Sequence, residues 1–159
     1  KIGVQTGSGF LIGIPGQDLE QLAREIIFTT ELKLHMIGCG PFIAGDNTPF
    51  AEHQRQFEPE IYFKTMAILR LLNPEAHIPS TTAFEVLEKG SRLELLNRGC
   101  NVFMPNLTPK QYRENYQLYP GKSFIDQEDD QYIVDLKEQI IGLGKTISSD
   151  PGHSKVVIS

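Results

Sequence analysis

Apolar residues in this 159-residue chain fall into short runs separated by longer segments with helical spacing. The short runs have the length and the Gly or Pro borders of buried strands, and they cover residues 9–14, 34–39, 77–82 and 101–104. Pro79, inside the third run, argues against a fully hydrogen-bonded interior position there. The pattern therefore predicts four strands.

The first helix is predicted directly after the first strand. Asp18 is placed as its N-cap, with Gln21 three residues later. Apolar residues then repeat at helical spacing, which predicts a stripe that faces a core, made of Leu19, Leu22, Ala23, Ile26 and Ile27.

Further helices are predicted between the later strands. One covers 59–72 and ends at Asn73-Pro74. A short one begins at a capping box of Ser91 and Glu94 and ends at Gly99. After an acidic stretch, a closing amphipathic helix is predicted from Ile133, Leu136, Ile140 and Ile141, followed by a loosely held tail from Ser148.

The alternation of strand and helix, four times over, indicates an α/β fold with parallel strands and right-handed crossovers. Four such units are half of a (β/α)8 barrel of the TIM type, which typically needs about 250 residues. A four-stranded open sheet is the competing architecture. The predicted domains are residues 1–122, which hold the β/α units, and residues 123–159, which hold the C-terminal helix and tail.

The stretch 101–122 reads as one unit with the features of a ligand site. Its apolar run ends at Pro105-Asn106, and Thr108 is placed as the N-cap of a helix with Pro109 at the first helical position. The helix carries the chain's cluster of three tyrosines, Tyr112, Tyr116 and Tyr119. A strand whose C-terminal end opens into an aromatic helix is a typical place for a ligand in an α/β protein.

Charge and composition exclude several classes of function. The net charge of -5 argues against a nucleic-acid module, and the apolar runs are too short to span a membrane. Cys39 and Cys100 belong to no metal-ligand spacing, so we expect two reduced, buried thiols in a cytoplasmic protein. The first residue is Lys1 rather than Met, which suggests a piece of a longer protein.

The residues themselves indicate chemistry only by position. Gly144-Lys145-Thr146 resembles the end of a P-loop, but Gln139 stands where its first glycine is needed. Thr81 and Thr82, at a strand end, offer groups suited to an anion or simply cap the next turn, and both interpretations stay open. For the tyrosines the residues alone favour helix packing, and for Met104 a place in the core.

Four segments carry a resemblance to a known family: GSGFLIGIPGQ, HMIGCGPFIAGDNTPF, LLNPEAHIPSTTAF and NRGCNVFMPNLTPKQYRENYQLYPGK. Together they closely resemble the C-terminal half of the HydE family, the radical S-adenosylmethionine (SAM) maturases of [FeFe]-hydrogenase. Biotin synthase and related enzymes are similar more distantly. The resemblance covers about Gln5 to Lys122, and its fourth segment is the most specific.

The resemblance implies that the four strands are the fifth to eighth of a (β/α)8 barrel. It implies SAM-binding roles for Gly9, Gly13, Met36 and Ile37. It also implies a substrate-side cavity, in which Thr81 and Thr82 form an anion-binding pair and the inner lining includes Met104, Tyr116 and Tyr119.

In the family, SAM is split by a [4Fe-4S] cluster into methionine and a 5′-deoxyadenosyl radical, which acts on a small iron-containing substrate. The CxxxCxxC motif that holds the cluster is absent from this chain. We therefore expect no catalytic or metal-binding residue here and no activity from this chain alone. The implied partners are the missing N-terminal half, the substrate and other hydrogenase maturases, with no nucleic acid and no membrane.

Two other functions stay open. One is a biotin-synthase-like sulfur-insertion enzyme, which the segment MPNLTPKQYRENYQLYPGK argues against. The other is a non-catalytic half-barrel that binds a small anion or pairs with another chain, because strand edges near Gln5 and Asn101 would be exposed.

Overall fold

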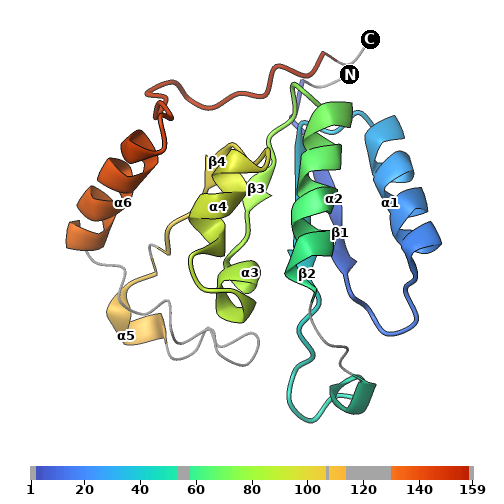
Figure 1. The fold of residues 1–159 in the computed structure, drawn as a ribbon. Helices are drawn as coiled ribbons and strands as arrows, with labels where there is room; N and C mark the ends of the chain where they lie inside the picture. The colour runs from blue at the N-terminus through green and yellow to red at the C-terminus, as the bar shows by residue number, and fades with distance from the viewer. Residues whose placement is uncertain (1–2, 54–57, 107, 114–129, 158–159) are drawn as a thin grey trace.

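The computed structural model describes residues 3–53, 58–106, 108–113 and 130–157. Parallel strands alternate with helices through most of this length, as the apolar pattern predicted (Figure 1). The elements in chain order are β1 (Gly7–Ile12), α1 (Leu19–Glu31), β2 (Met36–Pro41), the 3-10 helix η1 (Ala51–His53), α2 (Pro59–Leu72), β3 (Pro79–Ser80), α3 (Thr82–Leu87), α4 (Ser91–Asn97), β4 (Val102–Phe103), α5 (Lys110–Arg113) and α6 (Asp130–Gly142).

The longest strand pairing joins β1 and β2, which are parallel over six residue pairs from Gly7↔Met36 to Ile12↔Pro41. At the centre of this ladder Gly9 faces Gly38. A Cβ atom built on Gly9 would lie 1.6 Å from the carbonyl oxygen of Gly38, so no side chain fits at that position. The close approach of the two strands therefore depends on a glycine here.

The second parallel pair is short and joins β3 to β4. Backbone hydrogen bonds connect it to the first pair, because Ile37 N donates to His77 O at 2.8 Å and His77 N donates to His35 O at 2.9 Å. A side-chain hydrogen bond adds to the β3–β4 contact, because Asn101 Oδ1 accepts from Ile78 N at 2.8 Å. The strands thus follow one another in chain order across the protein.

The predicted strands are correct in number and order, but their bounds change. The first two lie two residues away from the predicted ranges, and the last two shrink to two residues each. Thr81 and Thr82 were predicted in the third strand but do not belong to it, because Thr82 is already the first residue of α3. A proline at Pro79 and the early start of α3 leave little room for a longer ladder.

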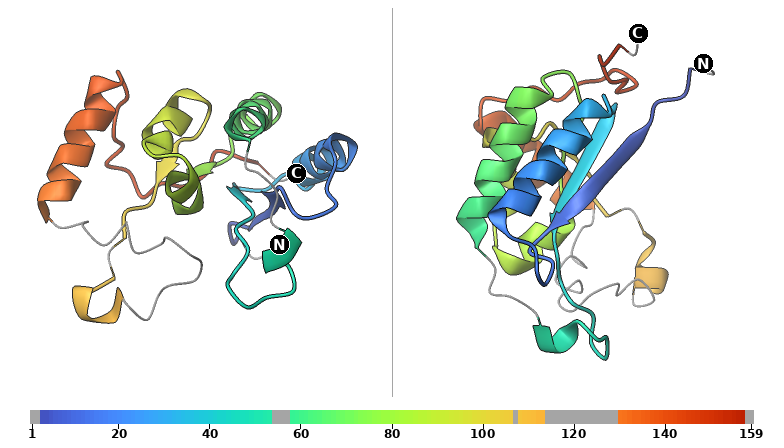
Figure 2. Two further views of the ribbon diagram at one scale, coloured as in Figure 1. Left: turned by 60° about the horizontal axis from the view of Figure 1, so that its bottom comes forward. Right: turned by 90° about the vertical axis from the view of Figure 1, so that its right-hand side faces the viewer.

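The helices cover one face of the strands. In the left view of Figure 2, α1, α2, α4 and α6 form an arc on one side, with the strands inside it. The loops that follow β1 and β2 lie at the bottom of Figure 1, opposite the two chain ends. The C-terminal strand ends and the chain termini are thus on opposite sides of the molecule.

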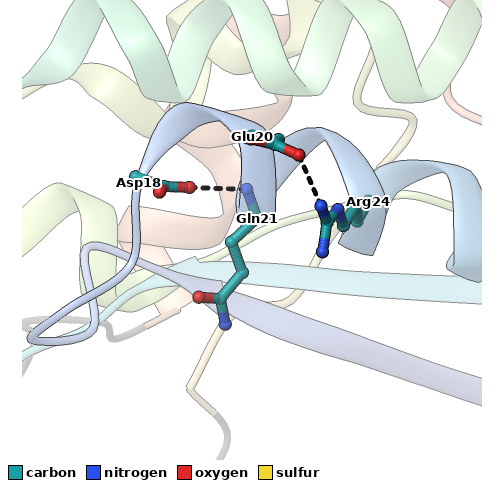
Figure 3. A network of polar contacts seen from close by, with 4 residues as sticks. All are labelled: Asp18, Glu20, Gln21 and Arg24. Atoms are coloured by element: carbon teal, nitrogen blue, oxygen red, sulfur yellow. Dashed lines mark hydrogen bonds and ion pairs between the residues drawn. The ribbon is translucent and has the colours of Figure 1, made fainter.

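The N-terminus of α1 forms as predicted, with Asp18 as N-cap (Figure 3). Gln21 N donates to Asp18 Oδ1 at 2.7 Å, which satisfies one of the free N–H groups of the first turn. The Gln21 side chain does not complete a capping box, since its amide donates to Glu25 Oε1 at 3.3 Å. Arg24 and Glu20 form an ion pair one turn apart.

The predicted stripe of α1 is only half buried, which corrects the sequence interpretation. Leu22 and Ile26 are each 6% exposed and pack in the core, whereas Leu19 is 68% and Ile27 is 55% exposed. Ala23, between these two, is also exposed. The strands beside α1 cover one narrow face of it, and its flank with Leu19, Ala23 and Ile27 has room for another element.

The core lies between the strands and α2. The bounds of α2 are as predicted, and Tyr62, Met66 and Leu69 on one face of it are fully buried. They pack against Ile37 of β2 and Phe84 of α3 in one cluster. The rings of Tyr62 and Phe84 lie 4.1 Å apart between centroids. This cluster fixes α2 against the strands.

The predicted capping box of α4 is wrong. Gly90, with φ of 84°, is the N-cap, and Ser91 is already helical. Glu85 of α3 takes over the capping role, because its carboxylate accepts from Gly90 N at 2.7 Å and from Arg92 N at 3.0 Å. A charged acceptor from a neighbouring helix satisfies the free N–H groups better than a hydroxyl would.

The stretch 101–122 is described only in part. Asn106 Oδ1 accepts from Thr108 N at 3.0 Å, and a four-residue α5 follows. Tyr112 is 53% exposed. Tyr116 and Tyr119 lie outside the described residues, as does the predicted domain boundary at residue 122.

The C-terminal tail is held more firmly than the sequence suggested. The predicted helix α6 is present and buries Leu136. After α6 the chain runs back to the end of the molecule where both chain termini lie. There Gly152 O lies 2.8 Å from His77 Nε2, and Ser154 N donates to Gln5 Oε1 at 2.8 Å. These contacts connect the end of the chain to the beginning of β1 and of the β3 segment (Figure 1).

In the part of the chain that the structure describes, none of the helices combines the length and the apolar character needed to cross a membrane.

The glycine contact between β1 and β2 leads to a stability prediction. Gly9→Ala should lower the free energy of unfolding by roughly 1–3 kcal/mol, because its Cβ would meet the Gly38 backbone and separate the strands. Gly38→Ala is the matched control, since the nearest atom to its added Cβ is 3.9 Å away. Urea unfolding followed by circular dichroism measures both. Equal destabilisation by the two substitutions would contradict the close-approach argument.

Candidate functional site

A cavity of about 730 Å³ lies against the strand face that is turned away from the helices. Its wall comes from β1, β2 and the segments that follow β2, β3 and β4. The lining residues are Gly9, Phe10, Leu11, Met36, Gly38, Cys39, Gly40, Pro41, Phe42, Ile43, Pro79, Thr81, Thr82, Ala83 and Met104. A volume of this size is in the range of small-molecule sites.

Strand alternation decides which side chains reach the cavity. Ile37 of β2 is fully buried in the core and is not part of the lining, whereas its neighbours Met36 and Gly38, and Gly40 further along the strand, line the cavity. The cavity face therefore carries glycines where a filled barrel interior would carry branched residues. A Cβ on Gly40 would extend to 3.7 Å from Thr81 Oγ1 and would occupy part of this space.

Five of the predicted site residues come together at this cavity. Gly9 and Met36 were predicted to contact SAM, and Thr81, Thr82 and Met104 to contact substrate; all five line the same cavity. They come from four separate segments of the chain, which only the strand pairing brings together.

Two predicted SAM-binding residues lie away from the lining. Gly13 follows β1 with φ of 86°, and its N–H donates to Gln17 Oε1 at 2.7 Å. The Ile37 side chain is fully buried in the core, and its N–H donates to His77. The predicted tyrosines Tyr116 and Tyr119 are outside the described residues.

Tyr62 of α2 contacts the cavity wall from the core side, and the sequence analysis did not single it out. Its hydroxyl donates to Cys39 O at 2.5 Å and lies 3.0 Å from Thr81 Oγ1. Burial raises the pKa of Tyr62, so the phenol keeps its proton. A tyrosine on the buried stripe of a helix needs a partner for its hydroxyl, and this was the available signal.

Arg92 supports the cavity wall from behind. This arginine is 3% exposed, and its Nη2 donates to Met104 O at 2.6 Å. Its guanidinium lies 3.9 Å from the centroid of the Phe103 ring. A buried cation held by a carbonyl and an aromatic face fixes the backbone from which Met104 projects.

The two thiols are buried and are held protonated. Burial raises the pKa of Cys39 well above its ordinary value, and it raises that of Cys100 to about 12. Arg70 acts in the opposite direction on the pKa of Cys100. Among the residues that the structure describes, no group of three His, Cys, Asp or Glu side chains could hold a metal ion.

Comparison with known proteins finds a relative that matches nearly the whole chain. Over 157 residues, 99% of this chain, the sequence is 38% identical to the [FeFe] hydrogenase maturase subunit HydE of Thermotoga maritima. The chain is similar to a part of HydE. It spans 45% of the length of that protein. The resemblance that the four quoted segments predicted is thereby confirmed, and it extends over nearly the whole chain. No protein-family model matches.

The raised thiol pKa values predict how stability depends on pH. Unfolded cysteines ionise near pH 8.5, whereas Cys100 in the folded protein keeps its proton up to about pH 12. Between these values the unfolded chain releases protons that the folded chain retains. The free energy of unfolding should therefore fall as pH rises above 8.5, by about 1.4 kcal/mol per pH unit for each thiol.

Urea unfolding at pH 8 to 10.5 measures this slope. The comparison is with Cys100→Ala, in which one of the two thiols is absent and the slope should be shallower. Identical slopes in the two proteins would show that Cys100 is already ionised or exposed in the folded state.

Proposed function

We propose that this chain is the substrate-side, C-terminal half of a radical SAM enzyme of the HydE type. The observation that carries the proposal is the glycine-lined cavity, built from the predicted SAM and substrate residues, in a chain 38% identical to part of HydE. HydE is described as a maturase subunit of [FeFe] hydrogenase. The role proposed here is in assembly of the diiron site of that enzyme.

The proposed architecture is half of a (β/α)8 barrel, with residues 1–122 as its β/α units and 123–159 as a closing helix and tail. Parallel strands in chain order and helices on one face support it. Among the described residues β1 pairs with β2 alone, and the neighbouring flank of α1 exposes Leu19 and Ile27. The missing N-terminal half would add its last strand and helix at this edge.

We propose that SAM occupies this cavity. Gly38 and Gly40 leave the strand backbone open to a ligand, and the apolar lining with Met36 suits an adenine ring. We propose that Gly9 and Met36 contact SAM directly. Gly13 and Ile37 act from behind, by shaping the end of β1 and the position of β2.

A [4Fe-4S] cluster does not fit this chain. The sequence has two cysteines, both buried as protonated thiols, whereas a radical SAM cluster takes three thiolates. The cluster ligands are assigned to the missing half, where SAM cleavage would supply a 5′-deoxyadenosyl radical. This chain alone is accordingly proposed to be inactive.

The residues of this chain bind and orient the second reactant. Thr81 and Thr82 provide the polar part of the cavity wall, and Arg92 holds the backbone of Met104 in place. Tyr116 and Tyr119 are proposed to complete the lining around a small iron-containing substrate. Other hydrogenase maturases would deliver or receive that substrate.

A non-catalytic association module is the second candidate, because the free edge of β1 and the exposed flank of α1 could bind another chain. The natural gene distinguishes the two. We expect a CxxxCxxC motif upstream of Lys1, and a full-length protein that forms 5′-deoxyadenosine from SAM and restores hydrogenase activity. A gene without the motif would favour the module, and biotin formation from dethiobiotin would favour a biotin synthase.

Filling the cavity should impair the full-length enzyme. Gly40→Val places two methyl groups toward Thr81, so the KM for SAM or substrate should rise about tenfold or more with little loss of stability. Gly142→Val, at the end of α6, is the control, because no atom lies within 4 Å of its added Cβ. Formation of 5′-deoxyadenosine measures both. Normal kinetics in Gly40→Val would place the ligand elsewhere.

A further inference from the structure

The Tyr62 hydroxyl has a single hydrogen, and its neighbours determine where that hydrogen lies. Cys39 O is a carbonyl oxygen and can only accept, so the hydrogen of the 2.5 Å contact belongs to Tyr62. The phenol is fully buried and stays protonated. Tyr62 therefore has no hydrogen left for its second contact.

The second contact consequently has one possible direction. Thr81 Oγ1 lies 3.0 Å from the Tyr62 oxygen, within hydrogen-bond distance. Because the Tyr62 hydrogen points to Cys39 O, the hydrogen of this bond comes from Thr81. The chain of donors runs from Thr81 through Tyr62 to the backbone of β2.

We propose that Tyr62 is a positioning residue that makes the Thr81 hydroxyl an acceptor toward the cavity and thereby selects ligands that present an N–H or O–H donor there. With its hydrogen committed to Tyr62, Thr81 Oγ1 has only lone pairs for a ligand. An ammonium, amide or hydroxyl group binds such an oxygen. A carboxylate or other anion at the same atom is repelled.

The setting makes this orientation decisive. Thr81 and Thr82 provide the hydroxyl groups of an otherwise mostly apolar lining, so a single fixed oxygen has a large effect on which ligand binds. The two threonines therefore do not act as an equivalent anion-binding pair. An anion would contact Thr82 or backbone N–H groups rather than the Thr81 hydroxyl. The inference rests on the proposed function only in taking this cavity as the ligand site.

Two small probes test the orientation without catalysis. Methylammonium is a donor with no acceptor, and acetate is an acceptor with no donor. The reporters are the labelled methyl groups of Met36 and Met104, which line the cavity, in NMR titrations of the full-length protein. Met66, fully buried in the core, is the internal control for general salt effects.

In the wild-type protein these reporters should show a dissociation constant for methylammonium about tenfold lower than for acetate. One charge-assisted hydrogen bond accounts for a difference of this size. In Tyr62→Phe the Thr81 hydroxyl is free to turn and can donate to acetate. The ratio of methylammonium affinity to acetate affinity should therefore fall about tenfold. Tyr112→Phe, at an exposed tyrosine, should leave the ratio unchanged.

Substitutions at Thr81 keep the test decisive even where Tyr62→Phe does not fold. Thr81→Val should weaken methylammonium about tenfold and leave acetate unchanged, whereas Thr81→Ser should retain the wild-type preference. Equal binding of the two probes, binding of neither, or acetate binding that depends on the Thr81 hydroxyl would overturn the proposal. These outcomes are independent of whether the enzyme cleaves SAM, which the 5′-deoxyadenosine assay decides.

Discussion

The close pairing of β1 and β2 at Gly9 and Gly38 is the contact on which the rest of this structure depends. It brings two strands together where a Cβ on Gly9 cannot fit, and it sets the register of the ladder. In that ladder Ile37 is buried in the core, and Gly9, Gly38 and Gly40 line the cavity. One steric requirement therefore produces both the packed core and the open cavity.

Hydrogen bonds of buried polar side chains connect the cavity wall to the core. Tyr62 belongs to the apolar stripe of α2, yet its hydroxyl joins the backbone of β2 to a threonine at the cavity wall. Arg92 makes a similar connection between α4 and the backbone of Met104. Because a buried polar atom without a partner is costly, these bonds fix the wall as firmly as apolar packing fixes the helices.

Some of the site could be predicted from the sequence, and particular residues show why the remainder could not. Thr81 and Met104 stand at strand ends, and strand ends of parallel β/α units converge, so their place at one cavity followed from position and resemblance. The resemblance assigned Ile37 to the SAM site together with Met36, but its side chain is buried in the core, because alternation along a strand sends adjacent side chains to opposite faces. Tyr62 was missed because helical spacing identifies a buried position without saying what its hydroxyl contacts.

The sequence by itself determined the order of strands and helices, the cap at Asp18, the span of α2 and the similarity to HydE. These features depend on residues near one another in the chain or on matched segments. The tertiary structure alone decided that only Leu22 and Ile26 of the predicted α1 stripe are buried, that Glu85 rather than Ser91 caps α4, and that the Thr81 hydroxyl turns toward Tyr62. Each of these depends on which groups from distant segments meet, and local spacing holds no information about that.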